Sequence, residues 1–131
     1  MEAGGERPAD ERLPRTRRIT RGSEIRRIVQ RGKRSRTGHL DVYDSPSPEA
    51  RSRVGVVVPR HGARIVDRNR VKRRLREILR RQVLPALDRA GLSTDLLVRA
   101  RREAYGAEYR ELHEELMTWV ERRCPHASSS R

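Results

Sequence analysis

The sequence predicts an α+β fold, an α/β sandwich in which helices cover a small mixed sheet. Segments with strand character alternate along the chain with segments whose apolar residues recur at helical spacing. The predicted order is helix, two strands with room for a third, helix, strand, helix. This order suits a single domain over residues 15-123 of the 131-residue chain.

The first helix is predicted over residues 23-31. One face is apolar, with Ile25, Ile28 and Val29, and arginines cover the other sides of the helix. Thr20 or Ser23 is the expected N-cap, because hydroxyl side chains accept hydrogen bonds from the free N–H groups of a first turn.

Two strands are predicted next. Residues 39-43 alternate, which places Leu40 and Val42 on one face and Tyr43 on the other, a face that we expect to stay open beside the first helix. Residues 54-58 form a β-branched run, which is typical of a buried strand.

The second helix is predicted from an N-cap at Asp67 to residue 81, with Pro85 interrupting the chain beyond it. At 100° per residue, its apolar and basic residues fall on opposite faces. The face expected to dock on the sheet has Val71, Leu75, Ile78 and Leu79. The opposite face has Asn69, Lys72, Arg73, Arg76 and Arg80.

The last strand is predicted over residues 95-100 and the last helix over residues 107-122. We expect Tyr109 to pack inward, because it shares a helical stripe with Leu112, Leu116, Trp119 and Val120.

The charge is strongly positive and unevenly placed. There are 32 Lys and Arg residues against 18 Asp and Glu, a formal net charge of +14. Residues 12-36 contain eleven basic residues against one acidic, and residues 60-81 contain ten against two. Such clusters repel themselves unless an anionic partner compensates them, and neither block has an aromatic residue to anchor it in a membrane surface. The sequence therefore predicts a nucleic-acid-binding protein.

The ends of the chain lack periodicity. Residues 1-14 and 124-131 are expected to be disordered, with Cys124 a free thiol near a frayed end. Because the sequence has no long apolar run and no secretory signal, we expect a cytoplasmic protein without a membrane partner. The histidines are not at zinc-ligand spacing, so no metal bound by the protein is expected.

The stretch from Val54 through Glu77, VGVVVPRHGARIVDRNRVKRRLRE, resembles the signature of the protein subunit of bacterial ribonuclease P. The likeness covers about residues 15-122. It implies a left-handed crossover between parallel strands, and an accessory subunit of an endoribonuclease that removes the 5′ leader of precursor tRNA. The RNA subunit would hold the catalytic Mg²⁺ ions. The protein would have no catalytic residue, no cofactor and no small-molecule substrate.

Carried over residue by residue, the resemblance implies two RNA-binding sites. The first would bind the catalytic RNA through Arg60, Arg64, Arg68, Asn69, Arg70, Lys72, Arg73 and Arg76. The second, a cleft between the first helix and the sheet, would hold the single-stranded leader and is lined by Ile25, Val29, Arg34, Arg36, His39 and Tyr43. The family usually has Phe in place of the first two, so Tyr43 is the expected platform for base stacking.

Three other functions are compatible with a basic chain. A ribosomal or chaperone-type RNA-binding protein has a similar composition, and only the Arg-Asn-Arg spacing argues against it. A helix-turn-helix DNA-binding protein would have two adjacent helices, whereas a Val-rich strand leads into the basic helix here. A stand-alone nuclease would need converging carboxylates, whereas the candidates are scattered along the chain: Asp41, Asp44, Asp67 and Asp95.

Overall fold

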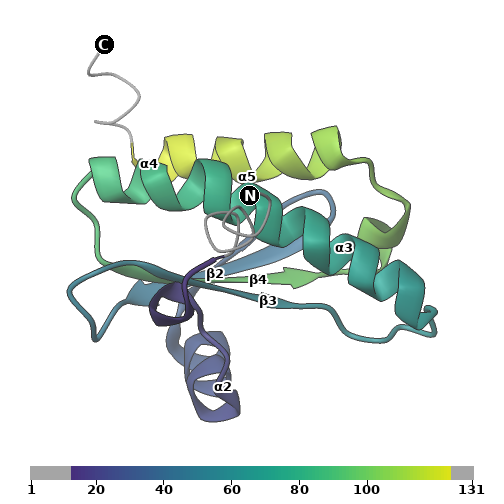
Figure 1. Ribbon diagram of the computed structural model, residues 1–131, viewed down its shortest axis with the longest axis horizontal. Helices are drawn as coiled ribbons and strands as arrows, with labels where there is room; N and C mark the ends of the chain where they lie inside the picture. The colour runs from purple at the N-terminus through teal and green to yellow at the C-terminus, as the bar shows by residue number, and fades with distance from the viewer. Residues whose placement is uncertain (1–12, 125–131) are drawn as a thin grey trace, which may run out of the picture.

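The computed structural model describes residues 13–124 and contains a four-stranded mixed sheet (Figure 1). The strands are β1 (Lys33–Arg36), β2 (Leu40–Pro46), β3 (Arg53–Val57) and β4 (Thr94–Ala100). Their order in the sheet is β1-β2-β4-β3. β2 is antiparallel to both of its neighbours, and β3 is parallel to β4. The predicted α+β class with a mixed sheet is confirmed.

Helices lie over both faces of the sheet (Figure 1). They are α2 (Gly22–Arg31), α3 (Ile65–Ile78), α4 (Leu84–Arg89) and α5 (Tyr109–Arg123). Shorter turns are η2 (Arg15–Arg17), η3 (Leu79–Val83) and η4 (Arg102–Gly106). α2 lies on one face, and the other three helices cover the opposite face. Because α3 and α4 connect β3 to β4, the parallel pair is formed by a helical crossover.

Each face of the sheet has its own core. Leu40 and Val42 lie in the main core with the apolar stripe of α3, which includes Val71 and Leu75. Tyr43 lies in a second core beneath α2. The alternation predicted for residues 39-43 is therefore confirmed for Leu40, Val42 and Tyr43, since neighbouring side chains of a strand point to opposite faces.

β1 precedes the two predicted strands, whereas the predicted order left room for a further strand after them. Its four residues, KRSR, have no apolar alternation, and their side chains are exposed or half-buried. Its register with β2 places Arg34 opposite Tyr43 and Arg36 opposite Asp41. Backbone pairing rather than burial defines this edge strand, so no hydrophobic pattern marks it.

The bounds of α3 differ from the prediction. Its N-cap is Arg64, so Asp67 is not the cap but lies in the first turn, where its carboxylate contacts Arg64 at 3.2 Å. An acidic side chain is favourable there because the first N–H groups are free. Helical backbone then continues beyond residue 81 through the π-helical turn η3 into α4. Pro85 is tolerated because it lies at the start of α4, after that widened turn.

The start of α2 also differs from the prediction. Neither Thr20 nor Ser23 caps it; the N-cap is Arg21, which makes no side-chain capping hydrogen bond. The first turn instead contains Glu24, whose carboxylate lies 3.3 Å from the Arg53 guanidinium of β3. An ion pair to the sheet therefore holds this end of the helix.

The folded domain is slightly longer than predicted. Leu13 and Cys124 are 8% and 3% exposed and belong to the main core. Burial raises the pKa of the Cys124 thiol, which is a core group and not part of a frayed end. The other residues expected to be disordered, 1-12 and 125-131, lie outside the described residues. Between residues 13 and 124, no helix is both long and apolar enough to cross a membrane.

Candidate nucleic-acid interface

The basic face of α3 forms one wall of a groove of about 510 Å³. Four residues predicted to bind RNA line this α3 groove: Asn69, Lys72, Arg73 and Arg76. The opposite stripe of the helix is buried in the main core, so the predicted division into apolar and basic faces is confirmed. Guanidinium groups and a neutral amide can bind phosphate oxygens without reading a base, so the α3 groove suits an RNA backbone.

Four other predicted residues lie at the N-terminal end of α3 and in the loop before it: Arg60, Arg64, Arg68 and Arg70. Arg60 and Arg64 are exposed. Arg68 is half-buried, and its Nη2 donates a long hydrogen bond of 3.4 Å to the Val58 carbonyl. The structure therefore divides the predicted set between the α3 groove and the beginning of the helix.

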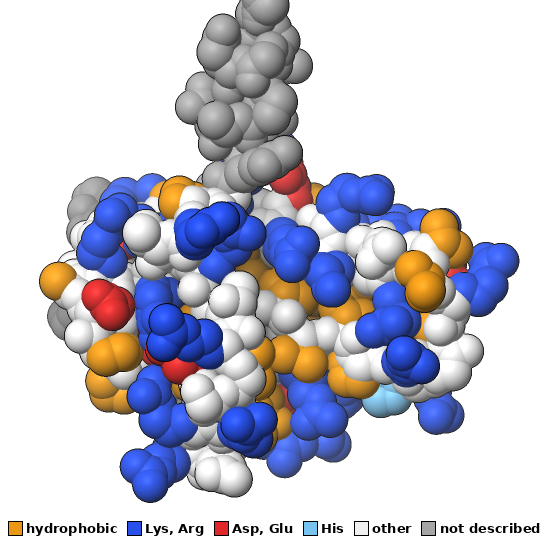
Figure 2. All heavy atoms as spheres, turned by 60° about the horizontal axis from the view of Figure 1, so that its bottom comes forward, with side chains coloured by type: hydrophobic (Ala, Val, Ile, Leu, Met, Phe, Trp, Pro, Cys, Tyr) orange, Lys and Arg blue, Asp and Glu red, His pale blue; other side chains and the backbone are white. Residues whose placement is uncertain are grey.

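Arg18 and Arg80 also line the α3 groove. The helical period places Arg80 on this basic face, whereas nothing in the sequence points to Arg18. Arg18 additionally lines a neighbouring groove of about 210 Å³ that reaches Ile25 of α2. Its Nε is buried and has no hydrogen-bond partner in the described part of the chain. Figure 2 brings the α2 side forward and shows Lys and Arg side chains on both sides of a hollow in which hydrophobic side chains are exposed. Arg18 thus connects the α3 groove to α2.

Tyr43 is buried beneath α2 and is not an open platform for a base. Only 4% of it is exposed, because Ile25 and Val29 of α2 pack over the core that it shares with Ile28 and Leu97. The predicted face of the sheet is correct, and the predicted exposure is wrong. Strand periodicity gives the direction of a side chain but not what covers it.

Tyr43→Ala is therefore expected to lower the free energy of unfolding by about 3 kcal/mol, because it removes a buried ring and leaves a cavity. Tyr43→Phe keeps the packing, and we expect it to change the free energy of unfolding by less than about 1 kcal/mol. Urea denaturation of both variants measures the difference. Unchanged stability in the alanine variant would contradict the buried position.

Arg34 and Arg36 extend the face on which α2 lies. Their side chains are 52% and 61% exposed, and both contact the buried Asp41 carboxylate, at 3.5 and 3.3 Å. Arg99 of β4 is also opposite Asp41 in register and is exposed. One carboxylate therefore faces several guanidinium groups, and this open part of the sheet has excess positive charge. No motif in the sequence pointed to Arg99.

A buried ion-pair network fixes α2 on the sheet. Arg53 donates two hydrogen bonds to Asp95, from Nε at 2.9 Å and from Nη2 at 2.7 Å. The same guanidinium lies 3.3 Å from Glu24 of α2. The hydrogen bonds with Asp95 raise the pKa of Arg53. Since Arg53 and Asp95 come from adjacent strands, the network ties the first turn of α2 to the beginnings of β3 and β4.

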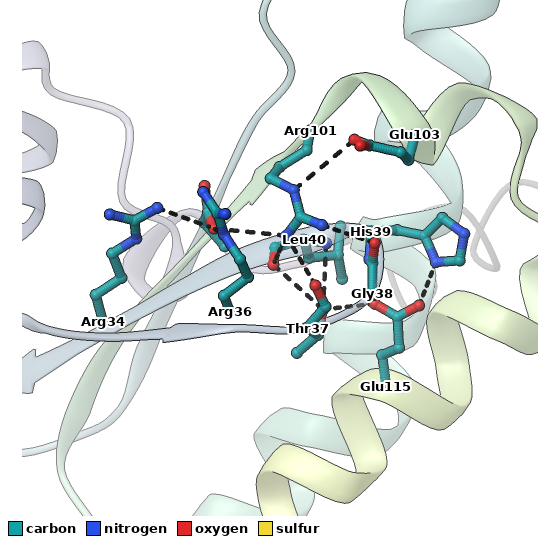
Figure 3. A network of polar contacts seen from close by, with 10 residues as sticks. Arg34, Arg36, Thr37, Gly38, His39, Leu40, Arg101, Glu103 and Glu115 are labelled. Atoms are coloured by element: carbon teal, nitrogen blue, oxygen red, sulfur yellow. Dashed lines mark hydrogen bonds and ion pairs between the residues drawn. The ribbon is translucent and has the colours of Figure 1, made fainter.

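His39 does not lie in the cleft beneath α2, contrary to the prediction. It is in the turn between β1 and β2, and its ring Nδ1 pairs with the Glu115 carboxylate of α5 (Figure 3). Glu115 also accepts hydrogen bonds from the His39 backbone N–H at 2.9 Å and from the Thr37 hydroxyl. The strand begins only at Leu40, so alternation does not determine the direction of residue 39.

These contacts of Glu115 predict a pH dependence of stability. Burial by itself would raise the pKa of Glu115, but hydrogen bonds from Thr37 and His39 outweigh it and lower the pKa from its ordinary value of 4.5. A lowered carboxyl pKa stabilises the folded state above the ordinary value, and the stabilisation is lost as the pH falls through the lowered pKa.

We therefore expect wild type to exceed Glu115→Gln in free energy of unfolding at neutral pH, with a difference that shrinks under acid conditions. Urea denaturation over a pH series measures it. A difference that stayed constant down to strongly acid pH would show that the charge of Glu115 is not involved.

The carboxylates considered for a stand-alone nuclease are held by arginines. Each contacts a guanidinium group within 3.3 Å: Asp41, Asp44, Asp67 and Asp95. Among residues 13–124, no group of three or more His, Cys, Asp or Glu side chains could hold a metal ion. The role of these four carboxylates in this fold is to form ion pairs.

Tyr109 does not pack inward as predicted. It is 38% exposed, and its ring lies nearly parallel to that of His113, at 6.2 Å between centroids. It is the first residue of α5, and the stripe that reaches the core begins one turn later, at Leu112. Ile65 and Val66 are likewise exposed in the first turn of α3.

Comparisons with known sequences identify a family of proteins that this chain resembles over most of its length. The family described as Ribonuclease P matches residues 13–123. A ribonuclease P protein component from Desulfovibrio desulfuricans is 36% identical over 124 residues, which cover 90% of this chain and 91% of that protein. One from Thermus brockianus is 41% identical over 96 residues, which cover 73% of this chain and 54% of that protein. The chain thus spans just over half the length of the Thermus relative.

Solved structures have the same fold. The RNase P protein of Staphylococcus aureus superposes with a TM-score of 0.68 at 23% identity, over 82% of this chain and 94% of that chain. The RNase P protein of Thermotoga maritima gives 0.65 at 25% identity, over 86% and 96%. Because the family match includes nearly all of the described residues, this chain belongs to the Ribonuclease P family, with the bacterial ribonuclease P protein components.

Proposed function

We propose that this protein is the protein component of a ribonuclease P ribonucleoprotein and supports the removal of the 5′ leader from precursor tRNA. The α3 groove carries the proposal, because Lys72, Arg73 and Arg76 line it beside the neutral donor Asn69. Several positive side chains on one helical face can bind successive phosphates of a folded RNA. The partner at the α3 groove would be the catalytic RNA.

The leader of precursor tRNA would bind on the α2 side of the sheet. Arg34, Arg36 and Arg99 supply positive charge there, and the burial of Tyr43 removes the expected stacking platform. We therefore expect this chain to hold the leader mainly through its phosphates. Arg18 lines the α3 groove and a neighbouring groove that reaches Ile25 of α2, so the protein can hold leader and catalytic RNA on neighbouring elements.

In this proposal the catalytic Mg²⁺ ions belong to the RNA subunit, and the protein acts by charge and position in the cytoplasm, where precursor tRNA is made. If about five phosphates are neutralised, the logarithm of the binding constant should fall with the logarithm of salt concentration with a slope of about −4. Binding that hardly changed with salt would contradict an electrostatic role.

Reconstitution tests the proposal. The protein is mixed with ribonuclease P RNA and a precursor tRNA at low Mg²⁺, with RNA-free protein as the control. We expect faster 5′ cleavage only when both subunits are present. RNA binding without acceleration would favour a ribosomal or chaperone-type role, and cleavage by the protein alone would favour a nuclease.

A further inference from the structure

Arg101, the residue that follows β4, binds the turn between β1 and β2 (Figure 3). Nη1 of Arg101 donates hydrogen bonds to the carbonyls of Thr37 and Leu40, at 2.8 and 2.9 Å. Nη2 donates to the carbonyl of Gly38 at 2.7 Å. Three backbone carbonyls of one turn are thus bound by a single guanidinium, whose side chain is only 19% exposed.

Glu115 of α5 binds the hydrogen-bond donors of the same turn. Its carboxylate accepts hydrogen bonds from the Thr37 hydroxyl and the His39 N–H, and it pairs with the His39 ring. A Cβ atom at Gly38 would lie 3.2 Å from Glu115 Oε2, so the turn approaches the carboxylate closely. Arg101 and Glu115 therefore bind complementary groups of one turn, carbonyls on one side and donors on the other.

β1 depends on this turn because it has little else to hold it. It is an edge strand without a buried side chain, and its partner in the sheet is β2 alone. Its two arginines, Arg34 and Arg36, extend over the open face beside α2. A shift of the turn would move both guanidinium groups together.

We propose that Arg101 and Glu115 are positioning residues for leader binding, which fix the β1–β2 turn and thereby place Arg34 and Arg36 for contact with leader phosphates. The inference rests on the proposed function and extends it to two residues remote from the α3 groove. Holding charged groups in place before binding lowers the entropy cost of ordering them. Neither residue needs to touch the RNA.

Substitutions of Arg101 separate geometry from charge. Arg101→Lys keeps the positive charge, but its single nitrogen cannot occupy both positions from which Nη1 and Nη2 donate to the turn. We expect Arg101→Lys and Arg101→Ala to weaken holoenzyme binding of a long-leader precursor tRNA to a similar extent, roughly tenfold, the effect of one lost charge-assisted contact. Binding of a substrate without a leader should stay unchanged. Full rescue by lysine would overturn the inference, since Arg101 would then act as a charge.

Substitutions of Glu115 and of its neighbour Glu114 form a matched pair of variants on α5, of which the second is the control. Glu115→Ala should reproduce the loss of affinity for the long-leader substrate, whereas Glu114→Ala, at an exposed neighbouring position, should not. Adding Glu115→Ala to the double variant Arg34→Ala, Arg36→Ala should cause no further loss, because residues that act through one another are not additive. Independent, additive losses would overturn the positioning role.

Amide hydrogen exchange on the protein alone gives a readout that needs no RNA. We expect faster exchange of the β1–β2 pairing in Arg101→Lys and Glu115→Ala, with β3 and β4 unchanged. Unchanged exchange at β1 would overturn the inference and leave the proposed function intact. A different result would overturn the proposed leader site: a wild-type holoenzyme whose affinity for precursor tRNA does not depend on leader length. The positioning role would fall with that site, even if the variants still showed faster amide exchange at β1.

Discussion

Replacing Arg73 and Arg76 together by alanine is expected to weaken binding to ribonuclease P RNA by about 100-fold. Each lost charge-assisted contact costs about 1.5 kcal/mol, or roughly tenfold in affinity. Both side chains are exposed in the α3 groove and form no ion pair within residues 13–124, so the fold should remain intact. Electrophoretic mobility shift at several salt concentrations measures the effect, and the salt slope should decrease by about two.

A double variant with the same change in net charge serves as the control. Arg89 of α4 and Arg110 of α5 are exposed and do not line the α3 groove. Arg89→Ala with Arg110→Ala should therefore change affinity only slightly. An equal loss in both double variants would mean that the overall positive charge of the protein binds the RNA and that the α3 groove has no special role.

Asp95→Ala is expected to lower the free energy of unfolding by about 3–5 kcal/mol, because it leaves the buried Arg53 guanidinium without its main partner. Arg53 is 7% exposed and Asp95 is fully buried, so water cannot replace the lost contacts. Thermal or urea denaturation measures the loss. A change below about 1 kcal/mol, the range of a surface ion pair, would contradict the burial of this network.

A second variant separates the charge from the packing. Arg53→Met combined with Asp95→Leu removes both buried charges, and we expect it to be more stable than Asp95→Ala, since the unpaired carboxylate that remains, Glu24, is partly exposed to water. Its affinity for leader-bearing substrate should still fall, because Glu24 of α2 loses its partner on the sheet. Wild-type leader affinity in this variant would show that the network does not set the position of α2.

The fold class and the basic face of α3 could be predicted because their signals are local. The separation of Val71 and Leu75 from Lys72 and Arg76 follows from the helical period within about two turns. The same holds for the alternation of Leu40 and Val42 with Tyr43. Edge strand β1 left no such signal, since its side chains are exposed or half-buried.

The sequence by itself determined the α+β class, the family resemblance and the basic face of α3, because periodicity and charge spacing are properties of neighbouring residues. Only the tertiary structure decided that α2 covers Tyr43, that His39 turns toward Glu115 of α5, and that Arg18 joins the α3 groove. The physical reason is that these contacts join residues distant in the chain. Their partners depend on how helices and strands pack, which no local pattern records.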